Sequence, residues 1–110
     1  AAMSDYLVVR EQAVHKLVGG CDLKRGALIE PISVCLHGID LARIKVGSTV
    51  AISGGGTMGM LMTQLAKRSG ATKLTVIEPI AMKREMAKKL GAEYIETIRG
   101  VGYKIAKENP

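Results

Sequence analysis

TVAISGGGTMGMLMTQLAKRSGATKLTVIE, residues 49–78, is the stretch that decides the expected fold. It opens with a short apolar and β-branched run, residues 49–53, which is typical of a buried strand. A glycine-rich turn follows, and Met and Leu residues then recur at helical period. The stretch closes with a second apolar run, residues 74–77, and one acidic residue, Glu78. The order of strand, turn, helix, strand and acid predicts a βαβ nucleotide-binding unit.

Gly54, Gly56 and Gly59 give the turn the spacing G-x-G-x-x-G. In a dinucleotide site the first glycine permits the tight turn, the second lets pyrophosphate approach bare backbone, and the third lets the helix pack closely. The helix N-terminus then favours an anion. Glu78 is placed to accept the ribose hydroxyls and to repel a 2′-phosphate, so NAD is the expected cofactor. The alternative is a glycine-rich turn without a ligand, in which Glu78 is a solvated surface acid.

Composition restricts the class of protein. The 110 residues have room for one domain with an aliphatic core, because the chain has three Tyr and neither Phe nor Trp. Much of the net charge of +6 falls on the two helices of the unit, at a spacing that favours a solvated helix face over a nucleic-acid patch. Two cysteines without a C-x-x-C motif favour a reduced, cytoplasmic setting. No apolar run is long enough to cross a membrane.

The segments before the unit are expected to add a hairpin and helices. Residues 6–17, YLVVREQAVHKL, predict two short strands joined by a polar turn at residues 10–12. A helix is expected from Asp22, acting as N-cap, until Pro31 interrupts it. A second helical stretch should then run to about Arg43.

After Glu78 the pattern predicts a further helix between Pro79 and Gly91, and a third strand at residues 93–98. Right-handed crossovers then give a parallel sheet of order 3-2-1. The expected fold class is α/β: a half Rossmann unit with a leading helix, an N-terminal hairpin and an added C-terminal strand or hairpin. The expected divisions are N-terminal strands at 1–20, a partial NAD-binding Rossmann domain at 21–96 and a hairpin-like tail at 97–110.

Most of the chain, about residues 6–95, resembles the medium-chain zinc-dependent alcohol dehydrogenases, most closely the sorbitol and threonine dehydrogenase branch. The resemblance is carried by residues 26–71, GALIEPISVCLHGIDLARIKVGSTVAISGGGTMGMLMTQLAKRSGA, by KLTVIEP at 73–79 and by AMKREMAKKLGAEYI at 81–95. It implies NAD(P)-dependent hydride transfer between an alcohol and a carbonyl at a catalytic zinc. It also implies that Gly54, Gly56, Thr57, Met58 and Gly59 line the pyrophosphate, that Glu78 holds the adenosine ribose and that Lys83 lies by the adenine.

Zinc itself is not expected in this chain. Glu30 matches a carboxylate that lies beside the catalytic zinc of the family, but the upstream domain with the Cys and His-Glu ligands is missing. Cys35 and His37 flank one residue, while Cys21 and His15 lie apart, and no spacing resembles a zinc site. We therefore expect no metal site, no catalytic residues and no dehydrogenase activity.

The tail departs from this family. YIETIRGVGYKI, residues 94–105, resembles the closing β-hairpin of winged-helix response regulators, but the recognition helix is missing and DNA binding is not expected. Three functions remain open: an NAD-binding fragment of an alcohol or polyol dehydrogenase, a truncated or recombined chimera without activity, and a winged-helix remnant. Val50 and Ile52 would lie on an open edge of the sheet, so we expect a homodimer, self-association, or the tail strand folded back on that edge.

Overall fold

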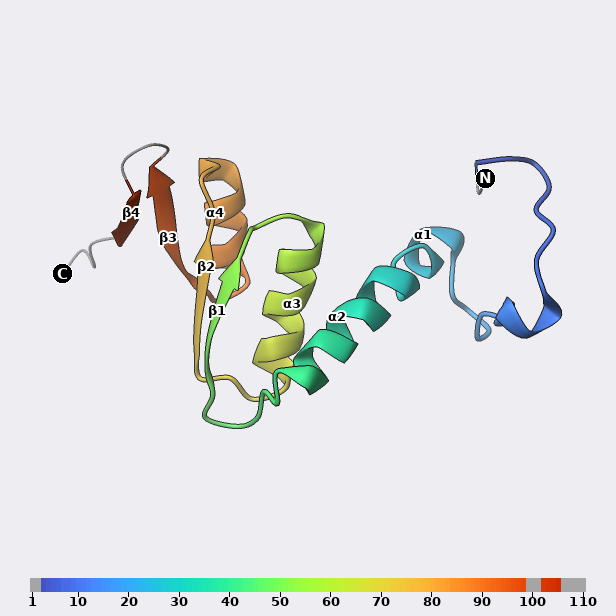
Figure 1. Cartoon of the computed structure of the whole chain (residues 1–110), viewed down its shortest axis with the longest axis horizontal. Coiled ribbons are helices and arrows are strands. Elements are labelled where there is room, and N and C mark those ends of the chain that lie inside the picture. The colour runs from blue at the N-terminus through green and yellow to red at the C-terminus, as the bar shows by residue number, and fades with distance from the viewer. Residues whose placement is uncertain (1–2, 99–101, 106–110) are drawn as a thin grey trace.

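The computed structural model of the chain describes residues 3–98 and 102–105. Its elements, in chain order, are the 3-10 helix η1 (Glu11–Ala13), α1 (Leu23–Gly26), α2 (Ile29–Leu41), β1 (Thr49–Ser53), α3 (Thr57–Arg68), β2 (Lys73–Ile77), α4 (Ala81–Lys89), β3 (Glu93–Ile98) and β4 (Gly102–Ile105). One sheet and its helices occupy one side of the molecule, and the N-terminal part extends away from them (Figure 1).

The four strands form one sheet of order β1-β2-β3-β4. The first two pairings are parallel, while β4 runs antiparallel to β3. This confirms the expected α/β half Rossmann unit with an added C-terminal strand. The expectation that the tail strand folds back on the first strand is wrong, because β4 lies at the opposite edge. The turn expected between β3 and β4 lies outside the described residues.

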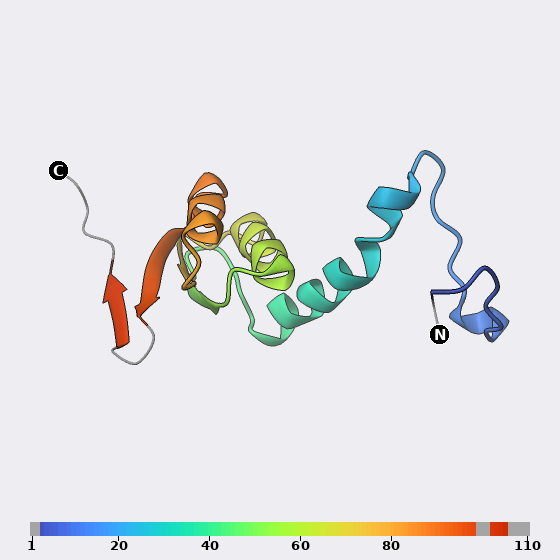
Figure 2. The ribbon, with the colours of Figure 1, turned by 90° about the horizontal axis from the view of Figure 1, so that it is seen from above.

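Both crossover helices cover the same face of the sheet (Figure 2), as two successive right-handed crossovers in one direction require. The core lies between this face and the helices, where Leu74 and Val76 of β2 are buried. Helix α2 packs against α3 and adds Cys35 and Ile39 to the buried residues. The core therefore fixes the direction of β1, β2 and the start of α3, which together carry the glycine turn.

The N-terminal hairpin predicted for residues 6–17 is wrong. Residues 3–20, here called the N-terminal arm, contain no strand, and the expected polar turn is the single-turn helix η1. The arm's side chains are exposed, with Val8 fully so and Val18 at 85%. A lone two-stranded hairpin is marginal in water, and these β-branched residues have no third strand or helix to pack on.

The helix break also lies earlier than predicted. Asp22 is the N-cap of α1, as expected, and its Oδ1 accepts a hydrogen bond from the Arg25 N–H at 2.8 Å. The helix is interrupted near Leu28, between α1 and α2. Pro31 lies within the first turn of α2. A proline is tolerated there because the first N–H groups of a helix have no intrahelical acceptor.

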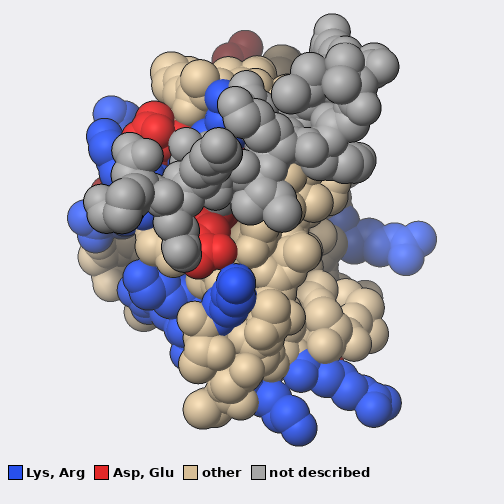
Figure 3. All heavy atoms as spheres, turned by 90° about the vertical axis from the view of Figure 1, so that its left-hand side faces the viewer, with Lys and Arg blue, Asp and Glu red and all other residues tan. Residues whose placement is uncertain are grey.

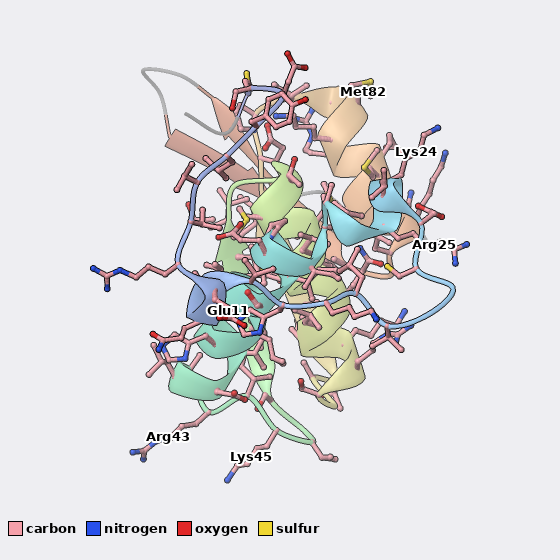
Figure 4. The ribbon with its side chains drawn as sticks, turned by 90° about the vertical axis from the view of Figure 1, so that its right-hand side faces the viewer. Glu11, Lys24, Arg25, Arg43, Lys45 and Met82 are labelled. Atoms are coloured by element: carbon pink, nitrogen blue, oxygen red, sulfur yellow. The ribbon has the colours of Figure 1, made fainter. Side chains whose placement is uncertain are left out.

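The molecule is elongated, with principal extents of 55 × 33 × 25 Å and a radius of gyration of 17.3 Å. A compact chain of this length would have about 13 Å. The arm, α1 and the near end of α2 project from the sheet, and Lys24, Arg25, Arg43 and Lys45 point outward (Figure 4). No helix in the described ranges is long and apolar enough to cross a lipid bilayer.

A hollow of about 220 Å³ opens beside β1. It is lined by the C-terminal part of α2, by β1 and by α3, including Gly38, Val50, Ala51 and Met62. Val50 is half-buried, whereas Ile52 is buried, so only one of the two residues expected at the open edge is accessible. Within the described ranges β1 pairs only with β2, which leaves its other side open.

Candidate functional site

The glycine turn connects the end of β1 to the start of α3. Gly54 has φ +96°, a conformation that favours glycine, and its N–H donates to the Ile77 carbonyl at 2.9 Å. Gly59 lies in the first turn of α3 directly against Gly54, where a Cβ would collide with the Gly54 carbonyl oxygen. A Cβ on Gly56 would meet no atom within 4 Å. The first and third glycines are therefore needed by the fold, while the second borders open space.

The start of α3 presents backbone N–H groups beside Gly56. The first intrahelical bond runs from the Met60 N–H to the Gly56 carbonyl at 2.9 Å, so the N–H groups of the three preceding residues have no helical acceptor. No side chain caps this end of the helix. Thr57 and Met58 are exposed. This end of α3 has the partial positive charge and the free donors that bind an anion.

Glu78 follows β2 and folds back over the glycine turn. Its Oε2 accepts the Gly55 N–H at 2.6 Å and its Oε1 accepts the Ile80 N–H at 2.8 Å. Only 4% of the residue is exposed. A Cβ on Gly55 would lie 2.9 Å from that same Oε2. Glu78 is therefore not the solvated surface acid of the alternative interpretation, because it links the ends of β1 and β2.

Glu78 is held in its charged form. Burial alone raises the pKa of Glu78, but the hydrogen bonds from Ile80 and Gly55, with the positive charges of Lys83 and Arg84, outweigh it and lower the pKa below its usual value. A carboxylate has about four acceptor positions, of which the two N–H groups use two. Two acceptor positions of the carboxylate therefore remain beyond these two bonds.

The two basic residues near Glu78 differ in their contacts. The Arg84 Nη1 donates to the carbonyl oxygens of Glu78, at 3.0 Å, and Pro79, at 2.6 Å. Lys83 is half-buried in the first turn of α4, and it makes no ion pair with Glu78 in the described structure. Lys83 therefore acts on the carboxylate through its charge, while Arg84 holds the backbone beside it.

The remaining candidates described here, Glu30, Cys35 and His37, lie on α2. Glu30 is exposed in the first turn of α2, and His37 is exposed further along the same helix. Cys35 is fully buried, and its thiol donates to the Met58 carbonyl at 3.5 Å. Burial raises the pKa of the Cys35 thiol, which confirms its interpretation as a small core residue. In the residues described, no three His, Cys, Asp or Glu side chains are grouped to hold a metal ion.

Figure 3 shows Lys and Arg side chains at several places around the margin of the face that it views. The interpretation of the basic residues as a solvated helix face, which follows from their helical spacing, stays a prediction.

Sequence reasoning missed Gly55 and Ile80 as parts of the site. It placed Arg84 near a 2′-phosphate but missed the bonds of its side chain to the backbone after β2. The doubled glycine at 55 and 56 was a signal, because it left the Glu78 side chain room above the turn. The bonds made by the Ile80 and Arg84 groups had no such signal, since they depend on how the chain turns after β2. The structure brings Gly54, Gly56, Gly59 and Glu78 together at one end of the sheet, as their spacing predicted, and leaves Glu30 outside.

No protein-family profile matches the chain. Among curated proteins, it is 44% identical over 87 residues to 2-dehydro-3-deoxy-L-galactonate 5-dehydrogenase of Pseudoalteromonas atlantica, covering 79% of this chain and 25% of the relative. It is 35% identical over 98 residues to sorbitol dehydrogenase of Bacillus subtilis, covering 89% and 28%. The chain therefore spans about a quarter of the length of these relatives.

Solved structures agree with the sequence relatives. Galactitol-1-phosphate dehydrogenase of Escherichia coli matches with a TM-score of 0.74 and 37% identity, over 83% of this chain and 26% of that one. A protein of Sinorhizobium meliloti described as a zinc-binding dehydrogenase, solved with NADP bound, matches with a TM-score of 0.61 and 51% identity, over 63% and 20%. These relatives are dehydrogenases and give no support to the winged-helix resemblance of the tail.

Proposed function

We propose that this chain, which is related over most of its length to the medium-chain zinc-type alcohol and sorbitol dehydrogenases, binds the adenosine diphosphate part of a nicotinamide dinucleotide. The glycine turn carries the proposal, because Gly56 borders open space beside the uncapped start of α3. The pyrophosphate would lie against Gly54, Gly56 and the first turn of α3. Glu78 would accept the ribose hydroxyls, with Lys83 next to the adenine.

The reaction is proposed only for the longer relatives. Their names describe oxidation or reduction of sugar acids and polyols, and the chain covers about a quarter of them. In such a protein the dinucleotide would supply or accept the hydride. We propose that the present chain binds the coenzyme as a fragment and does not turn over an alcohol by itself, because the described residues hold no set of zinc ligands.

The chain should prefer NAD to NADP. The NADP in the S. meliloti structure supports a nicotinamide dinucleotide as ligand, while Glu78 disfavours a 2′-phosphate of like charge. Lys83 and Arg84 offset part of this repulsion, so the preference should be on the order of 1 to 3 kcal/mol. ADP should bind nearly as well as NAD, because the proposed contacts involve only the adenosine diphosphate part.

Calorimetric titration of NAD, NADP and ADP tests the proposal on the wild type, Gly56→Ala and Glu78→Ala. Gly56→Ala should weaken all three ligands, because its methyl group occupies the space proposed for the pyrophosphate. Gly19→Ala is the matched control, since a Cβ there also meets no atom within 4 Å and the site is distant. Wild-type affinity in Gly56→Ala would refute the placement, and an unchanged NAD to NADP ratio in Glu78→Ala would remove Glu78 from the coenzyme preference.

A further inference from the structure

The Glu78 carboxylate is aimed at the glycine turn by backbone groups on two sides. The Gly55 N–H belongs to the turn after β1, and the Ile80 N–H belongs to the turn between β2 and α4. One carboxylate oxygen of Glu78 is bound to the Ile80 N–H, two residues further along the chain. The contact of the other oxygen with the Gly55 N–H therefore depends on the shape of the turn between β2 and α4. Whatever fixes the backbone at residues 78–80 therefore also fixes the carboxylate.

Arg84 fixes that backbone. It lies one turn into α4, and its Nη1 reaches back to the carbonyls of both Glu78 and Pro79. The Arg84 N–H also bonds to the Ile80 carbonyl at 3.1 Å as part of the helix. The side chain and the main chain of one residue thus hold three successive carbonyls, those of residues 78, 79 and 80.

We propose that Arg84 is a positioning residue for the nucleotide site, which orients the Glu78 carboxylate over the glycine turn by holding the β2–α4 turn. The proposal rests on the proposed function for its effect on the coenzyme. The effect of Arg84 on the orientation of Glu78 does not depend on a ligand and can be measured without one.

Charge and geometry can be separated at this site. Lys83 and Arg84 are the charged groups that act on Glu78 in the described structure. Both backbone N–H groups bond to the Ile80 carbonyl, but among the described contacts only Arg84 also holds the turn through its side chain. Arg84→Lys keeps the charge but replaces the planar guanidinium, which can bond two neighbouring carbonyls, with a flexible ammonium group. Lys83→Gln removes one charge and leaves the contacts of Arg84 in place, which makes it the matched control.

The test first measures the 110-residue chain without nucleotide. It uses the ¹³C carboxyl titration of Glu78 and the hydrogen exchange of the Gly55 and Ile80 amides. Arg84→Lys should raise the pKa of Glu78 and speed both amides by about tenfold, the size of one charge-assisted hydrogen bond. Lys83→Gln should leave the two exchange rates as in the wild type. Circular dichroism confirms that each variant is folded.

Titration with ADP then tests the link to the coenzyme. Arg84→Lys should bind ADP about tenfold more weakly than the wild type. Unchanged amide exchange and an unchanged Glu78 titration in Arg84→Lys would overturn the positioning role. A wild type that binds no dinucleotide would instead overturn the proposed function, and the ligand-free measurements would still decide the role of Arg84.

Discussion

Gly56 and Gly59 lie three residues apart, but a methyl group has opposite surroundings at the two positions. In Gly59→Ala it would collide with the Gly54 carbonyl, so α3 would have to move, and we expect a loss of about 1–3 kcal/mol of stability. In Gly56→Ala it meets nothing within 4 Å, and the loss should stay below about 1 kcal/mol from the weaker N-cap. Urea unfolding of both variants measures the difference. Equal losses would contradict this account.

The lowered pKa of Glu78 makes stability depend on pH. An unfolded glutamate has a pKa of about 4.3, and the folded value is lower, so the unfolded chain binds more protons between the two. The stabilisation is complete above pH 5 or so and is lost as pH falls through the folded pKa. Glu78→Gln should therefore be less stable than the wild type near neutral pH and should approach it in acid. Parallel curves of unfolding free energy against pH would contradict the prediction.

At the scale of single residues, spacing alone predicted the two glycines required by the fold and the acidic residue beside them. It could not predict that Glu78 bonds to Gly55, because 23 residues separate them and the contact depends on a side-chain rotamer. The role of Arg84 was missed for the same reason: its acceptors are backbone carbonyls, which leave no mark in the sequence.

The turns before β1 and before β2 each contain a glycine with positive φ. Gly70 has φ +95°, and its Cβ would lie 2.8 Å from the Val46 Cα, whereas Gly47 has φ +86° and open space around it. Gly47→Ala should therefore cost only the left-handed conformation, about 1–2 kcal/mol. Gly70→Ala should cost more, because it also forces the turn before β1 to move. Thermal unfolding compares the two, and an equal fall in Tm would show that the Val46 contact relaxes freely.

At the scale of elements, local patterns predicted the strands of the sheet better than the segments outside it. The predicted bounds of β1 and β3 are confirmed, because each run of β-formers has a neighbouring strand and a helix to pack on. Residues 6–17 have similar β-branched residues but no such neighbours, and they form no strand. The helix break predicted at Pro31 was wrong for a different reason. A proline interrupts a helix from its interior but is tolerated in its first turn, and the sequence pattern did not show which position Pro31 takes.

At the scale of the whole molecule, β1 pairs only with β2 among the described strands, and its other side lies open next to the apolar hollow. This strand has no charged residue, proline or bulge of the kind that protects edge strands from pairing. We therefore expect the chain to self-associate through this edge. Ala51→Lys, which adds a charge at an exposed position of β1, should shift it toward the monomer in sedimentation velocity, while Met82→Lys on exposed α4 should not. A monomer at all concentrations in the wild type would contradict the expectation.

The elongated shape could not be predicted from composition. The apolar content is that of a compact domain, and the sequence predicted that the first residues fold on themselves as a hairpin. Their side chains instead remain exposed, and the core formed by the sheet and helices α2, α3 and α4 includes no residue of the N-terminal arm.

The exposed N-terminal arm should be the first part of the chain that a protease cleaves. Proteolytic enzymes cut exposed backbone that needs little local unfolding, and Lys16 lies in such a segment, whereas Arg68 ends a helix packed on the core. Brief trypsin digestion should therefore remove the arm by cleavage after Arg10 or Lys16 well before any cut within α3 or α4. Mass spectrometry of the early products would identify the remaining piece, and early cleavage inside α3 would show that the arm is protected. The accessible arm makes the protease a probe of where the packed part of this chain begins.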